Sequence, residues 1–229
     1  MEIRSAEGGD DAKLFVSNLY SMYQKFCSRS KFQVKELERY NAKIGVSELR
    51  FMVTGKNAYN VLIDEAGGHR VQRVPPTTEK RGRRHTSTIT VAVLKEDEFK
   101  RMNLSNDDIT FQAYRGSGNG GQNRNKVSSA VRLVHKETGV AVCCEEERDQ
   151  HKNKKKALYR LEKKLNDTMQ TEHKKIIDEE RKVQVGCGMR GDKIRTYNYR
   201  ENRVTNHVTG KSVNRLREII EDGRIDLIK

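Results

Sequence analysis

The chain has 229 residues, which suits one large domain or two smaller ones, and 34% of them are hydrophobic, enough to fill a real core. Lys and Arg outnumber Asp and Glu by 46 to 32, and the net charge of +14 favours a folded nucleic-acid-binding protein. No apolar run reaches about 18 residues and no signal-peptide pattern follows Met1, so neither a membrane span nor secretion is supported and a cytoplasmic location is expected.

The first segment is predicted to be α/β. A short strand at residues 2–4 and a break at residues 6–9 precede a helix that Asp10 or Asp11 can cap. The helix has one apolar stripe, formed by Phe15, Leu19, Met22 and Phe26. This stripe is expected to face the core.

The rest of the first segment alternates between strand and helix patterns. Residues 46–54 form a strand, residues 57–63 a short helix, and residues 86–94 a second strand. In the second strand Ile89, Val91 and Val93 lie on one side and threonines on the other. The polar stretch at residues 95–108 marks the boundary, which gives a first domain of residues 1–108.

The second domain, residues 109–183, is predicted to combine a small sheet with a long helix. A strand at 109–114 leads into a glycine-rich loop, and a hairpin of residues 127–135 and 140–145 turns at Gly139. The helix covers residues 151–183. Its apolar side carries Leu158, Leu161, Leu165, Met169, Ile176 and Ile177.

The last segment, residues 184–229, adds a strand at 194–199 and a helix at 213–221 with Leu216, Ile219 and Ile220 on one side. The four cysteines have neither a CxxC pair nor a partnering histidine spacing, so reduced thiols are expected in place of disulfides or zinc ligands. No metal site and no cofactor are predicted.

The glycine-rich loop, residues 115–126, is the most unusual stretch of the chain. Four of the six residues 116–121 are Gly, which is favoured where a backbone needs positive φ or must approach another molecule closely. The cations Arg115, Arg124 and Lys126 indicate that this molecule is a polyanion. The alternative is a flexible hairpin tip with scattered charge. The basic run at residues 152–156 is equally open to two interpretations, a solvated helix face or an RNA-backbone contact.

Several ordered stretches then bear on the family. They are residues 2–4 (EIR), 8–12 (GGDDA), 67–75 (GGHRVQRVP), 84–87 (RHTS), 120–122 (GGQ), 147–154 (ERDQHKNK) and 194–199 (IRTYNY). Together they resemble the class I peptide-chain release factors of bacteria and their organelles. A lone GGQ would be weak support, but the ordered series is specific.

The resemblance implies an α+β protein in which residues 1–108 form a codon-reading α/β domain and residues 109–183 a GGQ domain. Residues 184–229 would pack back on the first domain. The chain begins where the family's central domain begins, so the amino-terminal helical domain is expected to be absent. Because that domain takes part in work with the recycling GTPase, partnership with a GTPase release factor is in doubt.

In the family the GGQ loop promotes hydrolysis of peptidyl-tRNA in the ribosomal peptidyl-transferase centre. Here Gly120 and Gly121 would let the backbone approach the transfer-RNA terminus, and the backbone N–H of Gln122 would stabilise developing negative charge. The Gln122 amide would select water as the nucleophile. No protein acid, base or metal is needed, so the chain is not expected to be an enzyme by itself.

Codon reading belongs to the first domain in the family. The loop from Pro75 to Thr78 is similar to the PxT determinant of factors that read UAA and UAG, but the chain is one residue longer than the usual pattern between Arg73 and His85. Either residues 75–77 or residues 76–78 could therefore read the codon. We favour Pro76, Thr77 and Thr78, because they keep the distance to His85.

The resemblance implies further contacts with the codon. His85 would stack between the second and third bases, with Gln72 and Thr86 at the third. The helix start at Asp11, after the loop at Gly8, would face the first base. For His85 alone, a hydrogen-bonded core histidine is the alternative.

The implied partners are the ribosomal RNA of both subunits, the messenger stop codon and the P-site peptidyl-tRNA. The RNA-binding residues would be Arg115, Arg124, Lys126, Lys152 and Lys154. A glutamine methyltransferase acting on Gln122 is a further possible partner. Two other functions stay open: a codon-independent ribosome-rescue hydrolase, and an RNA-binding competitor that occupies the A site without releasing peptide.

Overall fold

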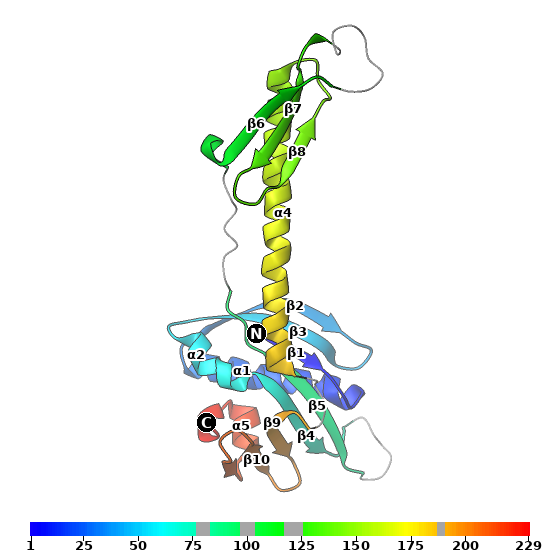
Figure 1. The fold of residues 1–229 in the computed structure, drawn as a ribbon. Helices are drawn as coiled ribbons and strands as arrows, with labels where there is room; N and C mark the ends of the chain where they lie inside the picture. Colours follow the sequence, from blue (N-terminus) through cyan, green and yellow to red (C-terminus); the bar gives the residue numbers. More distant parts are fainter. Residues whose placement is uncertain (77–82, 97–103, 117–125, 187–190) are drawn as a thin grey trace. The chain divides into compact units, whose positions relative to one another are not determined.

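The computed structural model describes residues 1–76, 83–96, 104–116, 126–186 and 191–229 (Figure 1). The chain divides into two compact units, Met1–Glu96 with Ile177–Lys229, and Asp97–Ile176. The sequence placed these borders near residues 108 and 183. The predicted α+β class is confirmed, and the C-terminal segment joins the first unit as expected.

Unit 1 is built on a sheet of eight strands in the order β11-β10-β9-β4-β5-β1-β3-β2. The strands are β1 (Glu2–Ser5), β2 (Gln33–Asn41), β3 (Val46–Thr54), β4 (Gly67–Arg73), β5 (His85–Ala92), β9 (Lys193–Asn198), β10 (Arg203–Asn206) and β11 (Ser212–Val213). Neighbours pair antiparallel except β4 and β9, which run parallel. The C-terminal strands therefore complete the sheet of the first segment.

The helices of unit 1 are α1 (Asp10–Arg29), α2 (Ala58–Leu62) and α5 (Leu216–Asp222), with 3₁₀ turns at Ile63–Glu65 and Ile225–Leu227. Helix α1 packs against α5 and β3, and its apolar stripe is buried as predicted. The predicted aspartate cap is wrong. Gly9 is the N-cap residue at φ 61°, without a side-chain cap, because the Asp11 carboxylate is bonded elsewhere.

The threonine side of β5 is buried as well as its apolar side. Thr88 is 0% and Thr90 6% exposed, so both sides of the strand are covered. Strand β2 was not predicted, since almost every residue in it is exposed and it shows no alternation of burial.

Unit 2 contains a three-stranded antiparallel sheet, β6 (Ile109–Tyr114), β7 (Ala130–His135) and β8 (Ala141–Cys144), preceded by a 3₁₀ turn at Asn106–Asp108. The predicted hairpin is confirmed, and Gly139 has φ 67° in its turn. Its core is a separate cluster, formed by Val131, Leu133, Cys144, Ala157, Leu161 and Leu165.

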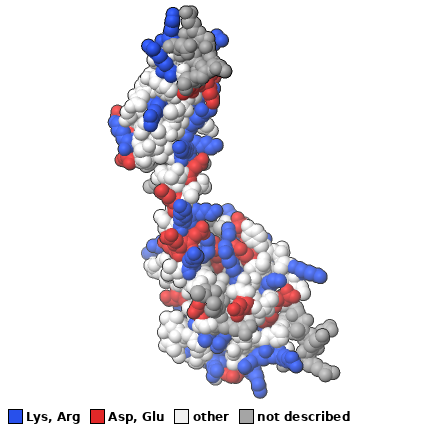
Figure 2. Space-filling view, turned by 45° about the vertical axis from the view of Figure 1, so that its right-hand side comes forward, with Lys and Arg blue, Asp and Glu red and all other residues white. Residues whose placement is uncertain are grey.

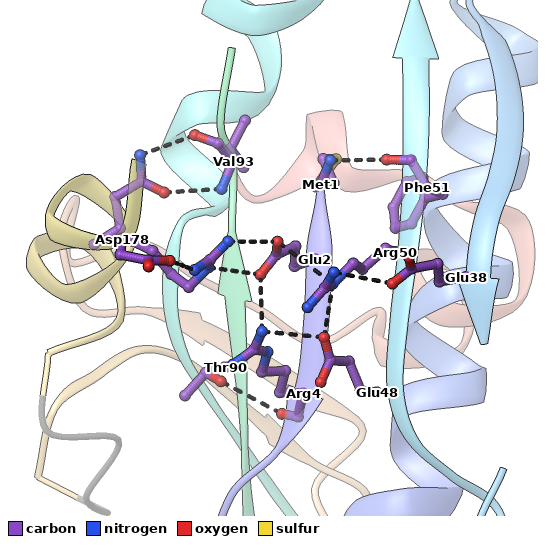
Figure 3. Close-up of polar contacts among 12 residues, drawn as sticks. Met1, Glu2, Arg4, Glu38, Glu48, Arg50, Phe51, Thr90, Val93 and Asp178 are labelled. Atoms are coloured by element: carbon purple, nitrogen blue, oxygen red, sulfur yellow. Dashed lines mark hydrogen bonds and ion pairs between the residues drawn. The ribbon is translucent and has the colours of Figure 1, made fainter. Parts of the chain in front are cut away.

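Helix α4 (Gln150–Val185) begins in unit 2 and ends in unit 1. The predicted apolar side is buried only as far as Leu165, and Ile176 is 56% exposed. In unit 1, Arg181 donates two hydrogen bonds of 2.8 Å to the Glu2 carboxylate. Gln184 exchanges two hydrogen bonds of 2.8 Å with the backbone of Val93 (Figure 3). These contacts attach the last turns of α4 to the sheet.

Within the described part of the chain, no helix combines the length and apolarity needed to cross a membrane. Three cysteines fall in the described ranges and all three are free thiols; Cys27 and Cys144 are buried, and Cys143 is exposed. Burial raises the pKa of the Cys27 thiol to about 11.

Candidate nucleic-acid interface

The antiparallel ladder of β4 and β5 brings together three of the residues expected to read a codon. Gln72 pairs with Thr86, and Arg73 pairs with His85. His85 is exposed, whereas Gln72 and Thr86 are half-buried. The alternative of a buried core histidine therefore does not describe His85. Pro76 is exposed beyond the end of β4, and the predicted Thr77 and Thr78 lie outside the described residues.

Asp11 links the start of α1 to this ladder. Arg73 Nε donates to one carboxylate oxygen of Asp11 at 2.7 Å, and Ser87 Oγ donates to the other at 2.9 Å. The side chains of Asp11 and Arg73 are 2% and 9% exposed. The Asp11 carboxylate is therefore used inside the protein and is not free to contact a ligand.

Gly8 packs against the same serine. It has φ 119°, and a Cβ at this position would lie 2.3 Å from Ser87 Oγ. The turn before α1 therefore needs Gly at this position both for its backbone angle and for the close approach to β5. Sequence reasoning found Gly8 and Asp11 but missed Ser87 and Arg73, whose partners are far away along the chain.

A hollow of about 460 Å³ opens beside Gln72. Arg73 forms part of its lining, and the Arg73 guanidinium lies 5.4 Å from the ring centre of Phe15 and 5.5 Å from that of Tyr199. The other lining residues are Val74, Arg84, Tyr199 and Arg200. The hollow is within the size range of small-ligand pockets, and its cationic lining suits an anionic group.

A buried polar cluster supports β4 and β9 from the core side. Arg195 donates two hydrogen bonds of 2.6 Å to the Glu65 carboxylate, and both side chains are almost fully buried. His69 lies within hydrogen-bond distance of the Glu65 carbonyl oxygen (3.0 Å) and the Tyr197 hydroxyl (3.1 Å). A carbonyl only accepts, so Nε2 carries the proton and Nδ1 accepts from Tyr197. Burial, aided by Arg195, lowers the pKa of His69 to about 3.

In unit 2 the side chain of Asn153 joins the start of α4 to the sheet. Asn153 is 0% exposed, and its amide nitrogen donates to the carbonyl oxygens of Ser129 and Glu147, both at 2.8 Å. Its amide oxygen accepts from the Glu147 backbone N–H at 2.9 Å. Ser129 directly precedes β7, so this one side chain fixes the base of the segment between β6 and β7. Sequence reasoning did not single it out.

The basic run at the start of α4 divides into two groups. Lys156 forms ion pairs of 3.2 and 2.6 Å with Glu146 and Glu147, so its charge is compensated within the protein. Lys152 is exposed and makes no ion pair with the described residues. Lys154 lies 5.3 Å from the ring centre of Phe111, which is itself 43% exposed. Lys152, Lys154 and the exposed Lys155 are therefore the lysines of this run whose charge is not compensated by an ion pair with the described residues.

Arg115 and Lys126 are exposed where the described chain stops and resumes around residues 117–125. The predicted Gly120, Gly121, Gln122 and Arg124 lie outside the described residues. Figure 2 shows Lys and Arg side chains on the surface of both units, and acidic side chains are interspersed among these basic ones.

Comparison with known proteins gives matches that cover residues of both units. A PCRF domain matches residues 1–91 and an RF-1 domain matches residues 96–208. Proteins named peptide chain release factor 1 from Caldicellulosiruptor bescii and Thermotoga maritima are each 44% identical over all 229 residues. The chain belongs to the peptide chain release factor family.

The release factor relatives are longer than this chain, which spans 64% of the Caldicellulosiruptor bescii protein and 66% of the Thermotoga maritima protein. The solved structure of RF2 of Thermus thermophilus matches 99% of this chain and 65% of its own length, with 35% sequence identity and a TM-score of 0.58. The RF-1 domain match extends to residue 208. It therefore includes β9 and β10, which complete the sheet of unit 1.

Proposed function

We propose that this chain acts in translation termination. It recognises a stop codon in the ribosomal A site and promotes hydrolysis of peptidyl-tRNA at the peptidyl-transferase centre. The observation that carries the proposal is the β4–β5 ladder, which places Gln72, Thr86 and the exposed His85 at neighbouring positions at one end of the two strands. An amide, a hydroxyl and an imidazole can each donate and accept hydrogen bonds at base edges. The relatives named peptide chain release factor 1 support this reading.

The stop codons we assign are UAA and UAG. Pro76, Thr77 and Thr78 supply the PxT-like determinant: proline restricts the loop, and a threonine hydroxyl can recognise a base edge. His85 stacks between the second and third bases, and Gln72 and Thr86 contact the third. Asp11 keeps the start of α1 against the ladder through Arg73 and Ser87.

The hydrolytic step belongs to Gly120, Gly121 and Gln122. The two glycines allow the main chain to approach the transfer-RNA terminus, and the Gln122 N–H donates to the charge that develops on the ester. The Gln122 amide positions water against larger nucleophiles. The ribosomal RNA supplies the rest of the centre, so the isolated chain hydrolyses little or no peptidyl-tRNA.

The partners follow from these roles. Arg115, Arg124, Lys126, Lys152 and Lys154 neutralise phosphates of ribosomal or transfer RNA. Gln122 is the candidate acceptor for a glutamine methyltransferase. A codon-independent rescue hydrolase is the alternative function, and it would not need the arrangement of Gln72, His85 and Thr86.

The test is peptide release from ribosome complexes that hold UAA, UAG, UGA, a sense codon or no codon in the A site. Release is expected with UAA and UAG alone. Equal release without any codon would favour the rescue hydrolase. Gln122→Glu is expected to bind ribosomes with unchanged affinity and to lose release, and full release by this variant would contradict the assigned chemistry.

A further inference from the structure

Arg70 has no partner for its charge in the described part of the chain. It lies on β4 between Thr88 of β5 and Thr196 of β9, and no carboxylate among the described residues pairs with it. Its Nε is buried and makes no hydrogen bond. Buried polar atoms are nearly always hydrogen-bonded, so an unpartnered arginine of this kind indicates a missing acceptor.

The basic groups around Arg70 also favour the binding of an anion at this site. Burial, and then the positive charge of Arg84, lower the pKa of Arg70. Burial, followed by Lys193 and Arg70, also lowers the pKa of His207. His207 Nε2 lies 2.8 Å from Thr196 Oγ1, which places it on the same side of the sheet. The site therefore collects cations that repel one another.

The threonine opposite Arg70 does not satisfy it. Thr88 is directly paired with Arg70 in the ladder, yet its buried Oγ1 makes no hydrogen bond with the described residues. Arg84 is close enough to lower the pKa of Arg70 and is exposed. Guanidinium groups suit a phosphate oxygen.

The ladder also indicates which phosphate would reach them. Residues 69 and 71 of β4 are fully buried in the core, so Arg70 and Gln72 share the opposite face. Along the ladder the pairs run from Arg73–His85 through Gln72–Thr86 to Arg70–Thr88, and the last two pairs lie on that face. Under the proposed function this is also the order from the second base to the third base and beyond. Arg70 lies two residues past Gln72, about 7 Å along the strand.

We infer that Arg70, together with Arg84, binds the phosphate on the 3′ side of the third codon base. This inference rests on the proposed codon-reading function. It gives the protein a contact with the messenger backbone that is independent of base identity, since phosphate contacts fix register and carry no sequence information. It also gives a role to the exposed Arg84.

The experiment uses ribosome complexes with UAA in the A site and two messengers that differ at one linkage, the one 3′ to the third base. One has the normal phosphodiester and the other a neutral methylphosphonate. The concentration of factor that gives half-maximal release is measured. For the wild-type chain the neutral linkage is expected to raise this concentration about tenfold, which corresponds to losing one charge-assisted hydrogen bond.

Arg70→Gln is expected to need about tenfold more factor on the normal messenger and to show no further loss on the neutral one. The matched control is Arg217→Gln, which removes an exposed charge from α5 on the helix-covered face and should keep the wild-type response to the linkage. The inference is overturned if Arg70→Gln raises the required concentration over that of the wild type by the same factor on both messengers. It is also overturned if the variant and the wild type need the same concentration on the normal messenger.

Two further measurements distinguish a structural role of Arg70, and a failure of the proposed function, from a failure of the phosphate contact itself. Because Arg70 has no stabilising partner, Arg70→Gln should melt at the same temperature as the wild type or higher. A clear fall in melting temperature would make Arg70 a structural residue and overturn the inference. If the wild-type chain shows no stop-codon-dependent release, the proposed function is wrong, and the inferred contact between Arg70 and the codon phosphate is wrong with it.

Discussion

The Glu65–Arg195 pair is the clearest test of a single contact in this protein. Its two hydrogen bonds of 2.6 Å lie in the core, with the side chains 1% exposed or less. Glu65→Gln leaves the Arg195 charge buried without compensation, and should lower the free energy of unfolding by about 3–5 kcal/mol in a urea titration followed by circular dichroism. Glu201→Gln is the control, because the Arg203–Glu201 pair is as short (2.7 Å) but about half exposed. Its effect should stay below about 1 kcal/mol, and equal effects would contradict the argument.

Single residues were predictable where local pattern decides them. The apolar stripe of α1 and the turn at Gly139 are such cases, because spacing and backbone geometry are local properties. Asp11 was not, since its partner Arg73 is 62 positions away and a cap was the only role that the neighbouring residues suggested. The exposure of His85 likewise depends on tertiary structure, and the family resemblance, not the histidine itself, pointed to it.

At the scale of elements, Asn153 connects the first turn of α4 to the strand that follows the GGQ segment. It makes three hydrogen bonds of 2.8–2.9 Å to the backbone of Ser129 and Glu147. Asn153→Leu leaves these backbone groups without partners, so unit 2 should lose about 2–4 kcal/mol of stability. Hydrogen exchange at the start of β7 measures the effect. Lys155→Leu, at an exposed position two residues away, is the control. Unchanged exchange in Asn153→Leu would rule out the connecting role.

The strands and helices were predictable to different degrees for physical reasons. Strands β3, β5 and β7 alternate in polarity and the long helix α4 has a stripe, so all four were found. Strand β2 escaped because it is an exposed edge strand of charged residues, and β10 and β11 because they are short. The residues proposed for the candidate site came from the family resemblance, and their roles stay predictions. The register that pairs Gln72 with Thr86 became visible only in the structure.

At the scale of the whole molecule, the described residues form two hydrophobic cores that share no residue. One lies between α1, α5 and the eight-stranded sheet, and the other between the small sheet and the first turns of α4. The sequence indicated both cores through separate stripes. It could not show that the last turns of α4 belong to unit 1, because this depends on the contacts of Arg181 with Glu2 and of Gln184 with Val93.

Separate cores should unfold separately. We expect two transitions in hydrogen exchange against urea, because each unit buries its own apolar surface. Glu65→Gln should lower the transition of β4 and β5 and leave that of β7 unchanged, whereas Asn153→Leu should do the reverse. With no shared partners, the double variant should add the two effects to within about 0.5 kcal/mol. A single common transition, or a fall of both transitions in either single variant, would show that α4 couples the two cores into one cooperative unit.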